Sequence, residues 1–125
     1  MATVIEERYS GPVLMDDIAA ECPSLTVTVA HTSVPWVDSS ISVATHEANV
    51  SIDLSGSSPK YSPPQLMCNV NSILEHEVLW GSALPTLTPD RWTKDFAEVG
   101  IQGELVPLIM RENAIHNLGL RSESA

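Results

Sequence analysis

Residues 25–30 read Leu-Thr-Val-Thr-Val-Ala, and the same alternation of apolar with small or hydroxyl side chains returns in Val-Ser-Ile-Asp-Leu-Ser at residues 50–55. Alternation with a period of two, in runs rich in β-branched residues, is typical of β-strands. A third short apolar run, Val-Leu-Trp-Gly at residues 78–81, also fits a strand. We therefore predict three strands, at about residues 25–30, 50–54 and 78–82.

The segments around these strands have apolar residues at helical spacing. Their ends carry helix signals: Pro12 stands at an early helical position, and Thr88 offers an N-cap hydroxyl just before Pro89. Gly119 fits a C-terminal helix stop. The predicted helices span residues 12–21, 37–46, 65–76, 88–100 and 103–118.

Strands that alternate with helices imply right-handed βαβ crossovers and a parallel sheet, so the predicted fold class is α/β. Three strands are few for such a sheet, because a parallel sheet needs both faces and both edges covered. We predict a single partial domain over residues 1–125, with an N-terminal lead at 1–8, βα units over 9–120 and a flexible tail at 121–125. This architecture is expected to be incomplete on its own.

Composition argues against several classes of function. Six basic residues stand against sixteen acidic ones, and the net charge of −10 repels nucleic-acid phosphates and anionic lipid surfaces. No segment approaches the roughly 18 apolar residues of a membrane span, and the first residues lack a signal-peptide pattern. We expect a cytoplasmic protein that binds neither nucleic acid nor membranes. Cys22 and Cys68 lack metal-knuckle or redox spacing and are expected to be buried free thiols.

Five blocks of sequence occur in an order that points to one family. They are Tyr9-Ser-Gly-Pro with Met15-Asp-Asp-Ile-Ala, Ala30-His-Thr-Ser-Val-Pro-Trp, Ile52-Asp-Leu-Ser-Gly-Ser-Ser-Pro-Lys-Tyr, Gly81-Ser-Ala-Leu-Pro-Thr-Leu-Thr-Pro-Asp-Arg-Trp with Lys94-Asp-Phe, and Glu112-Asn-Ala-Ile-His-Asn-Leu-Gly-Leu. Over residues 9–120 they resemble the C-terminal part of the amidohydrolase-related family. That family includes metal-dependent hydrolases and decarboxylases related to aminocarboxymuconate-semialdehyde decarboxylase. One block alone is weak, but five in order are specific.

This resemblance implies a place in a TIM barrel and a defect in its metal site. The three strands would be the last three of eight, whereas the family's H-x-H pair and a further histidine ligand lie on strands that this chain does not supply. In the family, an aspartate at the end of the eighth strand completes the metal site. Ala83 matches that aspartate, and its methyl group cannot ligate an ion. His31 matches the sixth-strand histidine and is the one candidate catalytic residue, as a vestige. Thr32 and Ser57 stand where the family often has proline and tryptophan.

Several of these side chains also have a purely structural interpretation. For His31, a structural hydrogen-bonding role is the alternative to a catalytic one. Asp53 is expected to be a buried, hydrogen-bonded carboxylate rather than a general base. Trp80, Trp92 and Phe96 are expected to pack in the core.

The remaining charged clusters are expected to be solvated rather than functional. His46-Glu47 and Glu75-His76-Glu77 combine imidazole with carboxylate, but each lies at a predicted helix end beside a turn. Lys94-Asp95 and Asp90-Arg91 are expected to be exposed charges. We therefore predict no bound metal and no cofactor.

Three functional hypotheses follow, and the third is an unrelated small binding domain whose similarity to the family is fortuitous. The first is a non-catalytic amidohydrolase-like fragment or pseudoenzyme that acts as an oligomeric or partner-docking subunit. The second is the C-terminal half of a split metal-dependent hydrolase or decarboxylase whose metal ligands come from another chain. Ala83 argues against this second hypothesis. Val27, Val29, Leu79 and Gly81 are expected to share the barrel's inward face with His31 and Ala83, so an apolar surface would be left exposed. The expected partner is therefore a second copy or a complementary or full-length amidohydrolase chain.

Overall fold

The computed structural model describes residues 11–33 and 36–120, and it contains one parallel sheet. The strands follow the order β1-β2-β3 and are β1 (Val27–Val29), β2 (Val50–Asp53) and β3 (Val78–Leu79). Val29 lies opposite Ile52, which in turn lies opposite Val78. The α/β class with three parallel strands is thereby confirmed. The predicted lead at 1–8 and tail at 121–125 lie outside the described residues.

Helices precede, connect and follow the strands. They are α1 (Pro12–Glu21), α2 (Val37–His46), α3 (Pro64–Val70), α4 (Pro89–Phe96) and α5 (Asn113–Asn117), with the short 3₁₀-helices η2 (Ala30–Ser33) and η3 (Pro59–Tyr61) and the π-helix η4 (Leu108–Glu112). The predicted bounds of α1 and α2 are confirmed, and the side chain of Thr88 caps α4 by accepting a hydrogen bond from the Arg91 N–H. No helix in the part of the chain described is long and apolar enough to cross a membrane.

The helix predicted over residues 65–76 is too long, because α3 ends at Val70. The carbonyl of Asn69 accepts bonds from the N–H groups of Ser72, Ile73 and Leu74, and the chain forms a turn at residues 71–73. The side chain of Asn71 bonds to the backbone of Gly100 and Gln102. These bonds anchor Asn71, the C-cap residue of α3, to the segment after α4, so a tertiary contact holds the chain where the helix ends.

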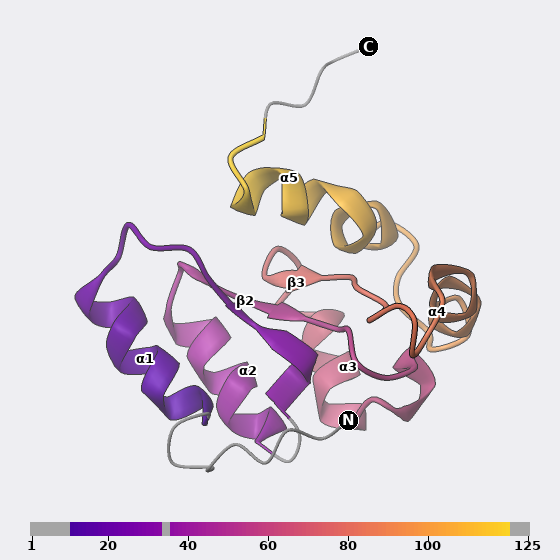
Figure 1. Cartoon of the computed structure of the whole chain (residues 1–125), viewed down its shortest axis with the longest axis horizontal. Helices are drawn as coiled ribbons and strands as arrows, with labels where there is room; N and C mark the ends of the chain where they lie inside the picture. The colour runs from indigo at the N-terminus through magenta and orange to yellow at the C-terminus, as the bar shows by residue number, and fades with distance from the viewer. Residues whose placement is uncertain (1–10, 34–35, 121–125) are drawn as a thin grey trace.

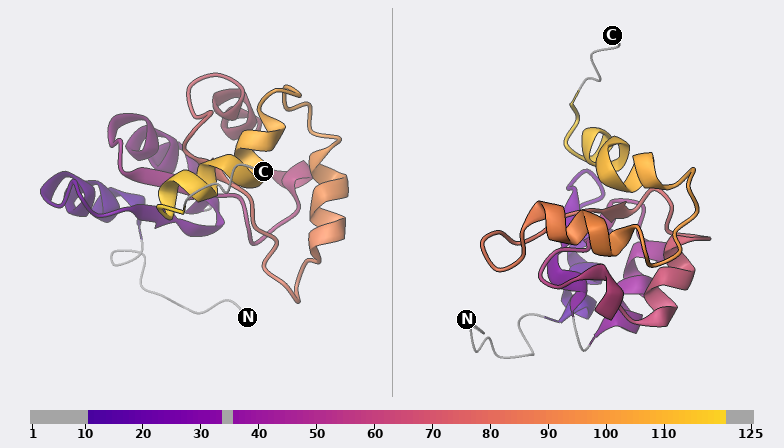
Figure 2. Two further views of the ribbon diagram at one scale, coloured as in Figure 1. Left: turned by 90° about the horizontal axis from the view of Figure 1, so that it is seen from above. Right: turned by 90° about the vertical axis from the view of Figure 1, so that its right-hand side faces the viewer.

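The sheet lies between two layers of helix. Figure 1 shows α1, α2 and α3 below the sheet and α5 above it, and the side view in Figure 2 agrees. Residues paired in register point to the same face of the sheet. The face toward α1, α2 and α3 carries core side chains that are each at most 8% exposed: Val27, Val29, Val50, Ile52 and Val78. On the other face, the side-chain amide of Asn117 in α5 donates a hydrogen bond to the Ser51 hydroxyl.

This arrangement corrects the predicted inward face. In a barrel the crossover helices lie outside, so the inner face is the one opposite α1, α2 and α3. Val27 and Val29 point toward those helices and are buried, so their prediction was wrong. Leu79 pairs with Asp53 on the inner face and is half-buried. The inner face of β1 carries only Thr28, so β1 adds no apolar side chain to that face.

Aromatic side chains close one end of the core. Trp92 is 0% exposed, and its ring lies 4.8 Å from the Phe96 ring and 5.6 Å from the Trp80 ring, centroid to centroid. The indole N–H of Trp92 donates to the Leu54 carbonyl over 3.4 Å, which ties α4 to the end of β2. The predicted packing role of these aromatic residues is confirmed.

Asp95 on α4 is buried, contrary to the prediction of an exposed charge. Its Oδ2 accepts hydrogen bonds from the Ser58 hydroxyl at 2.6 Å and from Arg91 Nε at 3.2 Å. The Ser58 bond lowers the pKa of Asp95, and Arg91 acts in the same direction against the opposing effect of burial. This carboxylate therefore joins α4 to the loop that follows β2.

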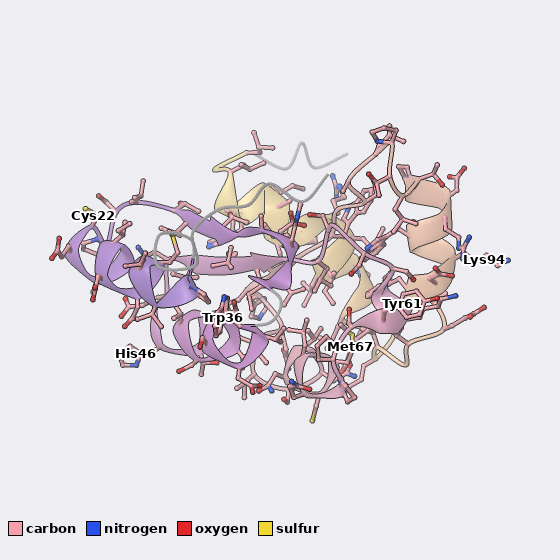
Figure 3. All side chains as sticks on the ribbon, turned by 60° about the horizontal axis from the view of Figure 1, so that its bottom comes forward. Cys22, Trp36, His46, Tyr61, Met67 and Lys94 are labelled. Atoms are coloured by element: carbon pink, nitrogen blue, oxygen red, sulfur yellow. The ribbon has the colours of Figure 1, made fainter. Side chains whose placement is uncertain are left out.

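The two cysteines are free, as predicted, but they are exposed rather than buried. Figure 3 shows Cys22 at the outer end of α1. Pro23 follows it and the chain leaves the helix there, so nothing in the described structure covers this thiol.

Candidate functional site

The carboxyl ends of parallel strands are where barrel enzymes place their active sites. Here β1 runs into His31, β2 ends at Asp53, and the segment after β3 contains Gly81 and Ala83. The loop after β2 adds Gly56. We call these five residues the carboxyl edge, and the structure brings His31 and Ala83, both predicted from sequence, to this same edge of the sheet.

Two residues of the carboxyl edge have backbone conformations that L-residues rarely adopt. The φ angles of His31 and Ala83 are 60° and 64°, in the left-handed region. That conformation costs about 1–2 kcal/mol for a residue with an ordinary side chain. Gly56 also has a positive φ, and a Cβ added there would lie 2.8 Å from Cγ of His31. The glycine therefore lets the imidazole lie directly against the loop after β2.

Asp53 is held by its own strand end. Its Oδ1 accepts the Ser55 backbone N–H at 2.9 Å, and its Oδ2 accepts the Ser55 hydroxyl at 2.6 Å. Gly81 makes room for this carboxylate, since a Cβ at that position would lie 2.7 Å from Oδ1. The prediction of a hydrogen-bonded carboxylate is confirmed, and Asp53 is half-buried.

His31 is exposed, and its ring packs against Gly56. The contact with Gly56 is a packing contact, and the structural hydrogen-bonding role of His31 stays a prediction. The carboxyl edge thus offers one exposed imidazole at His31, one carboxylate at Asp53 that accepts two hydrogen bonds from Ser55, and one methyl group at Ala83.

These groups do not fit the metal that the resemblance implies. A zinc site needs three or four protein ligands at bonding distance. In the described part of the chain, no three His, Cys, Asp or Glu side chains gather in a way that could hold an ion. The imidazole of His46 lies 3.8 Å from the Glu47 carboxylate, and Figure 3 shows His46 on the periphery. His76 and His116 line a shallow cavity beside η4, away from the carboxyl edge.

Two asparagines do structural work that sequence reasoning missed. The Asn113 side-chain amide, 3% exposed, donates to the carbonyls of Glu75 and Val78, which fixes α5 to β3. The Asn49 amide donates to three carbonyls, Ala19, Cys22 and Leu25, and so holds the end of α1 against the start of β2. Asn113 stands inside a block that resembles the family, but neither role has a local sequence signal.

Comparison with known proteins identifies both the fold and the family of this chain. Two solved structures share the fold: an uncharacterized TIM-barrel protein from Bordetella bronchiseptica (27% identity, TM-score 0.79) and amidohydrolase 2 from Bifidobacterium longum subsp. infantis (22% identity, TM-score 0.65). The alignments cover 90% and 89% of this chain but 40% and 47% of those chains, so the chain spans less than half of either one. The described structure is therefore part of a TIM-barrel fold.

The family model for amidohydrolases matches residues 3–120, and the chain belongs to that family. No curated protein matches it.

Ala83→Gly is expected to raise the free energy of unfolding by about 1 kcal/mol, because glycine adopts the left-handed conformation without the Cβ conflict. Ala97, with φ of −62°, is the matched control, and Ala97→Gly should lower stability by about 0.5–1 kcal/mol. Urea unfolding followed by circular dichroism measures both changes. Equal destabilisation by the two substitutions would contradict the left-handed backbone at position 83.

Proposed function

We propose that this chain is a non-catalytic segment of an amidohydrolase-like barrel that acts when docked on a partner. The observation that carries the proposal is Ala83 at the carboxyl edge, where the family resemblance expects an aspartate that binds metal. With Ala83 at that position, the carboxyl edge offers a metal the His31 imidazole and the Asp53 carboxylate, which are fewer than the three or four ligands that a zinc site needs. The unpaired, exposed cysteines suit the reducing cytoplasm in which we place the protein.

The backbone at position 83 supports the match to the family's aspartate. Aspartate and asparagine enter the left-handed region more readily than alanine does. Ala83 keeps this conformation, with φ of 64°, although its side chain gains nothing from it. An alanine in a backbone conformation that suits aspartate better is what we expect where a metal-binding aspartate has been lost.

The second candidate is one part of a split metal-dependent hydrolase or decarboxylase. The observation in its favour is the exposed His31 imidazole, which lies at the edge where barrel enzymes act on substrate. In that case a partner chain would bring the remaining ligands and the methyl group of Ala83 would have to be tolerated. The two candidates differ in whether metal-dependent turnover appears once a partner is bound.

An activity assay of the chain alone tests the first candidate. With zinc or manganese added, wild type and Ala83→Asp are both expected to show no turnover of an aryl ester or a hydroxybenzoate above buffer. One imidazole and one new carboxylate cannot hold a hydrolytic metal in an open geometry. Metal-dependent turnover that disappears in His31→Ala would overturn the proposal.

A further inference from the structure

The helix α1 is packed less completely than its neighbour α2. Two residues of α1 are buried, Pro12 and Ala19, whereas α2 buries Val37, Ser40, Val43 and Ala44. The reason is position: α2 packs against both α1 and α3, whereas α2 is the one helix of the described chain against which α1 packs closely. One flank of α1 is therefore open.

The open flank of α1 mixes apolar and acidic side chains. Leu14, Asp17, Ile18 and Glu21 follow the spacing i, i+3, i+4 and i+7, which puts them on one helix face, and all four are exposed. Leu14 is 37% and Ile18 42% exposed, and Leu25 in the loop after the helix is 48% exposed. No basic residue occurs in α1. A ligand of this face must offer apolar contacts together with positive charge.

The neighbouring strand has an open edge. β1 pairs with β2 alone in the described sheet, and the Val27 N–H bonds to the Asn49 carbonyl on that side. Because successive peptide groups of a strand point to opposite sides, the N–H and C=O of Thr28 face away from β2. Unpaired groups of this kind are a template for a further strand.

We propose that the open flank of α1 and the free edge of β1 together bind a strand and a helix of a partner chain with an amidohydrolase-like barrel segment. The partner strand would pair with β1 in parallel, and its helix would cover Leu14 and Ile18 and present Lys or Arg to Asp17 and Glu21. This inference rests on the proposed docking function and names the surface and the partner. Between two copies of this chain, the same contact would bring acidic α1 faces together, and each copy carries a net charge of −10.

The likeness to a TIM-barrel protein also favours a complementary partner over a second copy. The chain matches 40% of the Bordetella bronchiseptica TIM-barrel protein, so the remainder of that protein contains the other part of such a barrel. A barrel leaves no free strand edges, because each strand pairs on both sides. A partner that continues the sheet past β1 therefore satisfies the strand edge and the helix flank at once.

The test uses sedimentation velocity with this chain and, as the probe, the Bordetella bronchiseptica protein without the residues that this chain matches. We expect a one-to-one complex that weakens as salt rises, because the contact includes Asp17 and Glu21. Leu14→Asp with Ile18→Asp should weaken it by about ten-fold or more. Ile73→Asp is the matched control: Ile73 is 55% exposed in the turn after α3, and its substitution should leave binding unchanged.

Each other outcome counts against a definite part of the inference. A complex that Leu14→Asp with Ile18→Asp does not weaken would overturn this surface while leaving the docking function intact. Self-association of the chain that the same double variant abolishes would replace the partner with a second copy. Absence of any complex, with both chains folded by circular dichroism, would contradict the surface and the docking function together.

Discussion

Trp92→Ala is expected to lower the free energy of unfolding by about 3–5 kcal/mol. The side chain is fully buried and lies between the rings of Trp80 and Phe96. Its removal leaves a cavity that the rigid end of β2 cannot fill, and it also removes the indole bond to the Leu54 carbonyl. A loss of this size is a large fraction of the stability of a small domain.

Urea unfolding at neutral pH measures the Trp92→Ala effect, with Trp36→Ala as the matched control. Trp36 is 40% exposed, so its truncation should cost less than about 1 kcal/mol. Similar losses at both positions would show that Trp92 is not the centre of the core.

Asn113→Asp is expected to destabilise the chain by about 3 kcal/mol or more at neutral pH. The wild-type amide donates to the carbonyls of Glu75 at 2.9 Å and Val78 at 2.8 Å. A buried carboxylate has no proton to donate and would face two carbonyl oxygens, so it loses both bonds and repels both partners. The contact between α5 and β3 would open first.

The Asn113→Asp variant should recover part of its stability as the pH falls toward 4. Burial beside two carbonyls raises the pKa of the new carboxyl above its unfolded value, and the protonated acid can donate one hydrogen bond again. Asn69→Asp is the control, because Asn69 donates to the Gln65 carbonyl from an exposed site and should change stability little. A loss at Asn113 that does not depend on pH would contradict the buried contact.

The sequence predicts the order of elements well because their signals are local. Pro12 and the apolar spacing of residues 37–46 mark α1 and α2, and the Thr88 cap marks the start of α4. The inward face was predicted wrongly because the alternation of β1 was extended as far as His31. The strand ends at Val29, and the chain then enters the turn η2 with φ of 60° at His31. Alternation therefore says nothing about that imidazole.

The candidate site shows a similar division between what the sequence predicts and what it leaves open. His31 and Ala83 could be assigned because they lie in blocks that resemble the family. The contacts of Asp95 with Ser58 and of Asn113 with Val78 join residues more than thirty positions apart. No local pattern predicts such pairs, and Asp95 in particular reads as one more charge on an exposed helix until α4 is packed.

Zinc content tests the central claim, that the carboxyl edge is no longer a metal site. The chain is dialysed against a small excess of zinc, then against metal-free buffer, and is analysed for metal beside His31→Ala and Ala83→Asp. We expect far less than one zinc per chain in the wild type, with no difference in His31→Ala, because His31 is the one imidazole that the described carboxyl edge supplies. One zinc per chain in the wild type, lost in His31→Ala, would contradict the account.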